Sequence, residues 1–378
     1  MPARGAAPEP GGPGARWARR VTMAGVQAMS LQQLLGTAHP IIQAPMAGVQ
    51  GSALAVAVSN AGGLGSLPCA MLTPDAMRKE LAAIRAQTDR PFNVNFFCHA
   101  PPEPDAGREA AWRAALSPYY KEYGIDGDVV RAGPGRAPFS SEAADVLEEF
   151  RPAVVSFHFG LPSAGLLRRV RAWGSKILSS ATTVGEARWL EAHGADAIIA
   201  QGLEAGGHRG MFLSEDLTTQ VGTFALLPQI VRGVKLPVIA AGGIADARGV
   251  AAAMALGAVA VQIGTAYLLC PEATESAVHR AALKSETARH TALTNLFSGR
   301  PARGIVNRVM NELGPISAAT PAFPLAASAM APLRARAESR GSPDFSPLWC
   351  GQNAGGCKEI PAVELTRELA AGAALPRI

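Results

Sequence analysis

Residues 238–265 read VIAAGGIADARGVAAAMALGAVAVQIGT, two short apolar runs on either side of an alanine-rich segment. The runs, Val238–Ala241 and Val259–Ile263, are apolar almost throughout, which is typical of parallel strands that are buried on both faces. The segment between them, Asp246–Leu256, has the length and composition of a crossover helix. This stretch therefore predicts a strand–helix–strand unit with two parallel strands.

The same alternation extends upstream to about residue 40. Eight apolar runs predict strands: Ile41–Ala44, Gly63–Ser66, Phe92–Phe96, Val154–Phe157, Lys176–Ser179, Ala197–Ala200, Val238–Ala241 and Val259–Ile263. Helical segments lie between most of them: Ser52–Asn60, Pro74–Gln87, Gly165–Trp173, Val184–His193, Phe224–Arg232 and Asp246–Leu256. Eight parallel strands joined by helices favour an α/β fold, a closed (β/α)8 TIM barrel, over an open doubly wound sheet.

Three segments follow from this repeat. Residues 1–28 are rich in proline, glycine and alanine, and they predict a disordered N-terminal extension without the apolar core of a secretory signal. Residues 29–270 contain the predicted barrel. After Cys270 the alternation stops, and residues 271–378 predict a mainly helical C-terminal cap that covers one end of the barrel and contributes to the substrate region.

The composition excludes several classes of protein. The 378 residues are 48% hydrophobic and only 17% charged, which excludes wholesale disorder. The net charge of +5 comes without a basic stripe, so nucleic-acid binding is not expected. Residues 249–270 are uncharged, but they are rich in alanine and glycine and contain Gln262 and Thr265, so no membrane span is expected. Five cysteines without paired spacing indicate free thiols and a cytoplasmic location.

In a parallel barrel the active site lies at the carboxyl ends of the strands, so the residues after each apolar run are the candidates. Two successive runs end in glycine turns, Gly242–Gly243 and Gly264, and Thr265 adds a hydroxyl group. Glycine turns expose backbone N–H groups to an anion, and barrels often bind phosphate after strands seven and eight. These turns predict a phosphorylated ligand, with two packing turns as the alternative.

Residues 201–210, QGLEAGGHRG, form the richest of these segments, because four glycines surround His208. A histidine at a strand mouth can exchange protons near neutral pH. His158 follows the fourth run and can polarise a substrate, act as a second base or be a buried structural residue. No third ligand accompanies the two histidines, so no metal site is expected.

Eight segments between Ile41 and Asn353 occur together in an order that is specific as a set: APMAGVQG, SNAGGLGSL, PFNVNFF, SFHFGLP, QGLEAGGHRG, AAGGIAD, QIGTAYL and LWCGQNAG. With them the chain resembles class I of the nitronate monooxygenase family, formerly called 2-nitropropane dioxygenases. The N-terminal extension and the thiols of Cys350 and Cys357 depart from the family pattern. We interpret the two cysteines as incidental.

The resemblance implies an enzyme that carries FMN. It implies that the FMN phosphate is held by Gly242, Gly243, Gln262, Gly264 and Thr265. It also implies that the rest of the cofactor is lined by Met46, Asn95, Gln201, Gly202 and Gly206. His208 resembles the family's catalytic histidine, and His158 resembles a histidine that lines the substrate pocket.

The resemblance further implies the reaction. Alkyl nitronates such as propionate 3-nitronate react with O2 to give a carbonyl compound and nitrite, by way of a flavin semiquinone. A cationic His208 can hold the anionic nitronate, and a neutral His208 can take the α-proton of a nitroalkane. The alternatives are an FMN-dependent NAD(P)H reductase of enoyl thioesters or quinones, and a flavin-binding sensor without turnover. The expected partners are the nitronate, O2 and a second copy in a homodimer.

Overall fold

The computed structural model describes residues 31–127 and 136–374, so the predicted extension at residues 1–28 lies outside the described residues. Its centre is a sheet of eight parallel strands in the order β1-β9-β8-β6-β5-β4-β3-β2. The strand bounds are β1 Ile41–Gln43, β2 Gly65–Pro68, β3 Phe92–Phe97, β4 Val154–His158, β5 Lys176–Ala181, β6 Ala197–Gln201, β8 Val238–Ala241 and β9 Ala260–Ile263. Each predicted run is therefore a strand.

The sheet closes on itself between β1 and the start of β2. Ile42 and Leu64 form a parallel bridge. The Leu64 N–H donates to the Ile41 carbonyl at 2.8 Å, and the Gln43 N–H donates to the Leu64 carbonyl at 3.0 Å. The interior is filled by buried apolar side chains that include Ile42, Leu64, Val154, Leu178, Ile199 and Ile239. Closure confirms the TIM barrel and excludes the open sheet.

Helices surround the barrel as α2 Ser52–Asn60, α3 Pro74–Arg85, α5 Ser141–Phe150, α6 Ala164–Ala172, α7 Val184–His193, α8 Thr223–Gly233 and α9 Ala247–Ala255. Most begin at a side-chain cap that accepts a hydrogen bond from a first-turn N–H: Thr73, Ser140, Ser163, Thr183 and Asp246. The short helix α1, Leu31–Leu35, packs Leu34 and Leu35 against the buried side chains inside the barrel.

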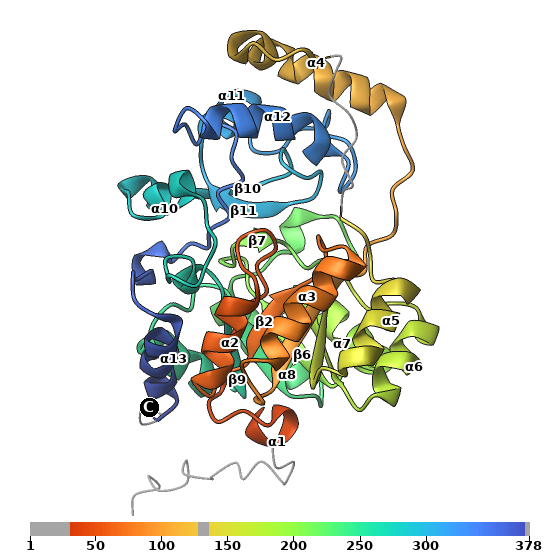
Figure 1. The fold of residues 1–378 in the computed structure, drawn as a ribbon, viewed down its shortest axis with the longest axis vertical. Helices are drawn as coiled ribbons and strands as arrows, with labels where there is room; N and C mark the ends of the chain where they lie inside the picture. The colour runs from red at the N-terminus through yellow and green to blue at the C-terminus, as the bar shows by residue number, and fades with distance from the viewer. Residues whose placement is uncertain (1–30, 128–135, 375–378) are drawn as a thin grey trace, which may run out of the picture.

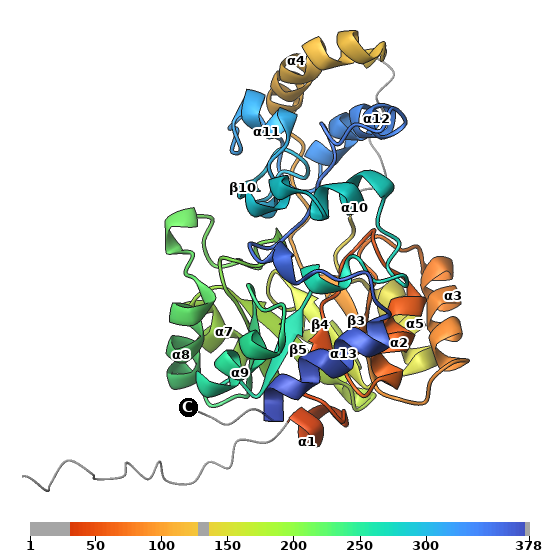
Figure 2. The same ribbon diagram turned by 90° about the vertical axis from the view of Figure 1, so that its left-hand side faces the viewer.

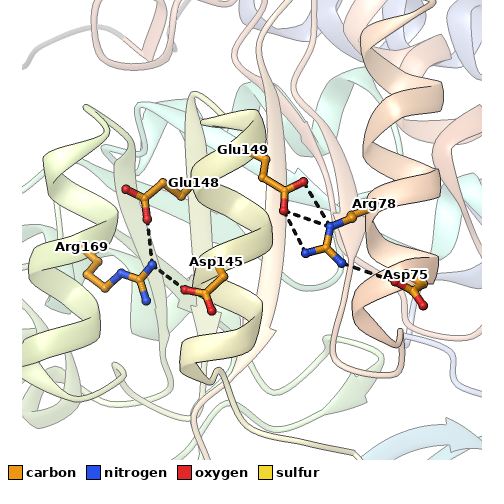
Figure 3. A network of polar contacts seen from close by, with 6 residues as sticks. All are labelled: Asp75, Arg78, Asp145, Glu148, Glu149 and Arg169. Atoms are coloured by element: carbon orange, nitrogen blue, oxygen red, sulfur yellow. Dashed lines mark hydrogen bonds and ion pairs between the residues drawn. The ribbon is translucent and has the colours of Figure 1, made fainter.

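The outer helices are tied by exposed ion pairs (Figure 3). Arg78 on α3 pairs with Glu149 on α5, and Arg169 on α6 donates to Asp145 and Glu148 on α5. Exposed pairs of this kind contribute little to stability, so the buried core rather than this network determines the barrel geometry.

The cap lies above one end of the barrel (Figure 1). It contains a three-stranded sheet in the order β10-β11-β7, with β7 Gly207–His208, β10 Thr291–Thr294 and β11 Ala302–Ile305. The helices of the cap are α4 Ala106–Tyr123, α10 Ala277–Leu283, α11 Arg308–Leu313 and α12 Ala326–Glu338. The short strand β7 thus belongs to the loop after β6 and pairs with the cap.

The boundaries predicted at residue 270 differ from the structure in two ways. First, α13 (Ala362–Ala371) packs against α2 and α9, where it takes the place of the barrel's eighth helix (Figure 2). Second, α4 comes from the predicted barrel segment but packs on α12 of the cap, and the Tyr120 hydroxyl donates to the Ala329 carbonyl at 2.6 Å. Residues 271–361 are therefore an insertion before the last barrel helix.

No helix in the described ranges is long and apolar enough to cross a lipid bilayer. The uncharged residues 249–270 are divided among α9, β9 and a 3-10 turn at Thr265–Tyr267.

Candidate active site

A cavity lies at the carboxyl ends of the strands, between the barrel and the cap. Eleven of the twelve predicted site residues line it: Met46, Asn95, His158, Gln201, Gly206, His208, Gly242, Gly243, Gln262, Gly264 and Thr265. The structure thus brings together residues from six strand ends that are spread over 220 positions of sequence.

The twelfth residue, Gly202, does not line the cavity. A Cβ atom at this position would lie 1.8 Å from Thr223 Oγ1 and 2.5 Å from the Thr223 nitrogen. Glycine is therefore required here because the start of α8 packs directly against the chain. This close approach explains why residue 202 is glycine, without any contact to a cofactor.

The glycine turns form a cradle at one end of the cavity. Gly242 and Gly243 line the cavity and have φ values of +115° and +73°, a backbone conformation that favours glycine. The Gly351 N–H donates to Thr265 Oγ1 at 2.9 Å, so the Thr265 hydroxyl proton is available to a ligand. Because Asp246 already caps the start of α9, the loop amides rather than the helix end supply donors to an anion.

The other part of the cavity has polar atoms suited to a heterocyclic ring. Gln262 Oε1 is buried and has no hydrogen-bond partner in the described structure. Asn95 Nδ2 donates to Ser156 Oγ at 2.9 Å, which fixes the orientation of its amide group. A buried acceptor without a donor is costly, so the orphaned oxygen fits a ligand that carries an N–H group. The cradle and this acceptor together fit the phosphate and ring of FMN.

His208 projects from β7, whose backbone pairs with β11 at Ala302. Its Nε2 atom lies 2.8 Å from Ser298 Oγ. The Ser298 hydroxyl donates to the Arg300 carbonyl at 3.3 Å, so it accepts the hydrogen bond from His208 Nε2–H. This arrangement assigns the lone pair of the ring to Nδ1.

The surroundings of His208 favour its neutral form. Burial lowers its pKa well below 6.5, and the positive charge of Arg136 and further cationic or histidine groups lower it more. Aromatic rings surround the imidazole, with centroid distances of 5.3 Å to Phe323 and 5.5 Å to Trp349. His208 is therefore uncharged at pH 7, which is the state required of a proton acceptor.

Both ring nitrogens of His158 are engaged. Nε2 lies 3.1 Å from the His208 carbonyl oxygen, and Nδ1 lies 3.1 Å from Ser180 Oγ. Because a carbonyl only accepts, Nε2 carries the proton and Nδ1 accepts from the serine hydroxyl. Burial lowers the pKa of His158 to about 4, so the ring is neutral at pH 7. This geometry favours a positioning task for His158 over the role of a second base.

Sequence reasoning missed several residues at the site. Trp349, Gly351 and Asn353 line the cavity, and Asn353 Nδ2 donates to the Gly243 carbonyl at 2.9 Å. These residues lie in the segment LWCGQNAG, which contributes to the family resemblance but which the sequence did not predict to be part of the site. Arg136 also lines the cavity and Ser298 contacts His208, and neither has a local sequence signal.

The cysteines do not form a nucleophilic or metal site. All five are free thiols, and burial raises the pKa of both Cys350 and Cys357 to about 12. Over residues 31–127 and 136–374, no group of three or more histidine, cysteine or acidic side chains is placed to hold a metal ion.

Comparisons with known proteins agree with this architecture. A family model described as nitronate monooxygenase matches residues 28–372. The nitronate monooxygenase of Pseudomonas aeruginosa is 46% identical over 340 residues, which cover 89% of this chain and 97% of the relative. The enzyme of the same name from Paraburkholderia phytofirmans is 45% identical over 349 residues, with 90% and 93% covered.

Solved structures show the same similarity. A nitroalkane oxidase from Streptomyces ansochromogenes has a TM-score of 0.83 and 40% identity, and it covers 91% of this chain and 97% of its own. FabK from Thermotoga maritima has a TM-score of 0.67 and 30% identity, with 90% and 94% covered.

Proposed function

The chain belongs to the nitronate monooxygenase family, and from this premise we propose that it oxidises alkyl nitronates such as propionate 3-nitronate. The other reactant is O2, and the products are a carbonyl compound and nitrite. The observation that carries the proposal is one cavity that is lined both by the buried His208 and by the glycine cradle. A cytoplasmic location and a homodimer belong to the same proposal, and the five free thiols support the location.

We propose FMN as the cofactor of this site. Gly242, Gly243, Gly264 and Thr265 would hold its phosphate, with Gly351 beside them. Met46, Asn95, Gln201 and Gly206 would lie along the ring and the ribityl chain, and Gln262 would face an N–H group of the ring. The orphaned Gln262 Oε1 supports this assignment, because it needs a donor that residues 31–127 and 136–374 do not provide. When bound, FMN would supply the electron-transfer chemistry.

The protein side chains would handle the substrate and its proton. Neutral His208 would take the α-proton of a nitroalkane at Nδ1, while Ser298 holds Nε2. His158 and Gln201 would fix the backbone of His208, since both donate to its carbonyl oxygen. The aromatic rings around the imidazole would exclude water from the reacting carbon.

Oxygen consumption tests this function directly. We expect FMN-loaded protein to consume O2 and release nitrite on addition of propionate 3-nitronate, without NAD(P)H. With nitroethane as substrate, His208→Ala should lower kcat/KM by about 100-fold or more, the usual contribution of a general base. The FMN content of the variant, measured by absorbance, is the control for folding.

Two outcomes would contradict the proposal. Rapid reduction of bound FMN by NAD(P)H without O2 uptake on nitronates would identify a reductase instead. Bound FMN without turnover by either route would identify a flavin-binding sensor.

A further inference from the structure

The lining of the cavity also includes a positively charged side chain. Arg136 lines it and is half-buried. The chain is held close to the barrel just after this residue, because Pro138 forms a parallel bridge with Phe97 and the Phe139 N–H donates to the Phe97 carbonyl at 2.8 Å. Arg136 is thereby placed over the carboxyl end of β3.

Arg136 and His208 share one aromatic neighbour. The Cζ atom of Arg136 lies 5.8 Å from the centre of the Phe323 ring, and the His208 ring centre lies 5.3 Å from the same point. The positive charge of Arg136 also acts on His208, as one cause of its lowered pKa. The guanidinium group and the proposed base therefore both lie near the Phe323 ring, and both line the same cavity.

No carboxylate in the described part of the chain forms an ion pair with Arg136. Two carboxylates line the cavity, but both are engaged elsewhere. Glu204 accepts from the Thr223 N–H and hydroxyl, and Glu275 pairs with His279 at 2.9 Å. Burial lowers the pKa of Arg136, and the nearby charge of Arg334 adds to this effect.

A partly buried cation without a counter-charge has lost hydration that nothing in the described protein replaces. An anionic group on the ligand would replace it, and a guanidinium matches a carboxylate through two parallel hydrogen bonds. We propose that Arg136 is a specificity-determining residue that binds a carboxylate at the end of the substrate remote from the nitronate group. This inference rests on the proposed function and adds the residue that would recognise the carboxylate of a nitronate such as propionate 3-nitronate.

Paired substrates test the assignment. Steady-state kinetics would compare propionate 3-nitronate with propyl 1-nitronate, which has no carboxylate, in the wild type, Arg136→Gln and Arg136→Lys. We expect Arg136→Gln to lower kcat/KM for propionate 3-nitronate by about 10- to 100-fold, the usual worth of a hydrogen-bonded charge, mainly through KM. The value for propyl 1-nitronate should change by less than about threefold.

The lysine variant keeps the charge but not the paired donors, so it should recover part of the loss on propionate 3-nitronate. Equal losses on both substrates, or no loss on either, would overturn the role of Arg136. The wild type provides a test that needs no variant: succinate, which has a carboxylate in place of the nitronate, should inhibit about tenfold more tightly than butyrate. Equal inhibition by the two acids would also overturn it.

Failure of the proposed function would look different. If the wild type oxidised neither nitronate, the function would be wrong, whereas binding of succinate would still report on Arg136. That binding can be followed through the absorption spectrum of the bound flavin. A succinate-dependent change that disappears in Arg136→Gln, with the butyrate response unaltered, would support the carboxylate site independently of turnover.

Discussion

The Nε2 atom of His158 lies 3.1 Å from the backbone carbonyl oxygen of His208. The Gln201 side chain donates to the same oxygen at 2.9 Å, and its own Oε1 accepts from the Gly210 N–H at 2.7 Å. Two donors therefore fix the main chain at the residue whose side chain faces the cavity. We therefore expect the two histidines to contribute differently: His208 would contact the ligand, and His158 would hold the His208 backbone in place.

His158→Ala should lower kcat/KM for nitroethane by about tenfold, since one of the two donors to the His208 carbonyl is lost. His158→Gln keeps a side-chain donor and should recover part of this loss. The pH profile should keep the same shape in both variants, because a positioning residue contributes no ionisation to it. Disappearance of a limb of the profile in His158→Ala would show instead that His158 exchanges protons with the substrate.

The pH dependence of nitroalkane oxidation should report the neutral form of His208. Burial and neighbouring positive charge place its pKa well below 6.5, so the proton-accepting form is complete at pH 7. We expect kcat/KM for nitroethane to be flat from neutral to alkaline pH and to fall only in acid, well below pH 6.5. This acid limb should be absent in His208→Ala. Activity that falls as the pH rises through neutrality would indicate a cationic His208.

The barrel could be predicted from sequence because its signals are local. Continuous apolar runs indicate buried parallel strands, and the glycines after Ala241 and Ile263 indicate turns whose backbone can approach a ligand. The cradle and His208 follow from reading these strand ends in order. Gly202 shows the limit of this reasoning, since a glycine required for packing on Thr223 has the same local appearance as one that borders a cofactor.

The cap could not be predicted in the same way, because contacts between distant segments determine it. Trp112 and Tyr120 of α4 are buried against α12, and each donates to a carbonyl of that helix more than 200 residues away. The position of α13 is determined by its packing against α2 and α9, two helices that lie far from it in sequence. Arg136 has no periodic or motif signal, and its proposed role rests on its place in the cavity lining and on the absence of a paired carboxylate among the described residues.

Gly206→Ala should disturb the segment that closes the cavity. A Cβ atom at Gly206 would lie 2.6 Å from the Gly351 nitrogen and 2.7 Å from the Cys350 carbonyl carbon, and backbone atoms cannot yield as side chains do. We expect FMN affinity to fall by about tenfold or more. Gly355→Ala is the matched control, because an added Cβ meets nothing within 4 Å there. Equal FMN affinities for the two variants, measured by fluorescence titration, would contradict the proposed closure.

Arg209, next to His208 in sequence, should matter for stability and not for chemistry. Its side chain is fully buried and donates to the Gly202 carbonyl at 2.7 Å, the Gln201 carbonyl at 2.8 Å and Gln220 Oε1 at 2.9 Å. Burial lowers its pKa to about 10, so the group is still charged at pH 7.

Arg209→Met leaves these three buried acceptors without donors, and we expect the free energy of unfolding to fall by about 3 kcal/mol or more. Arg171→Met is the control, since the exposed Arg171 also donates to a carbonyl, that of Gly194 at 2.6 Å, but water can replace it. Urea denaturation of the two variants measures the difference. An equal, small loss of stability in both variants would contradict this prediction. It would show that the three buried hydrogen bonds of Arg209 do not hold the loop after β6 against the start of α8.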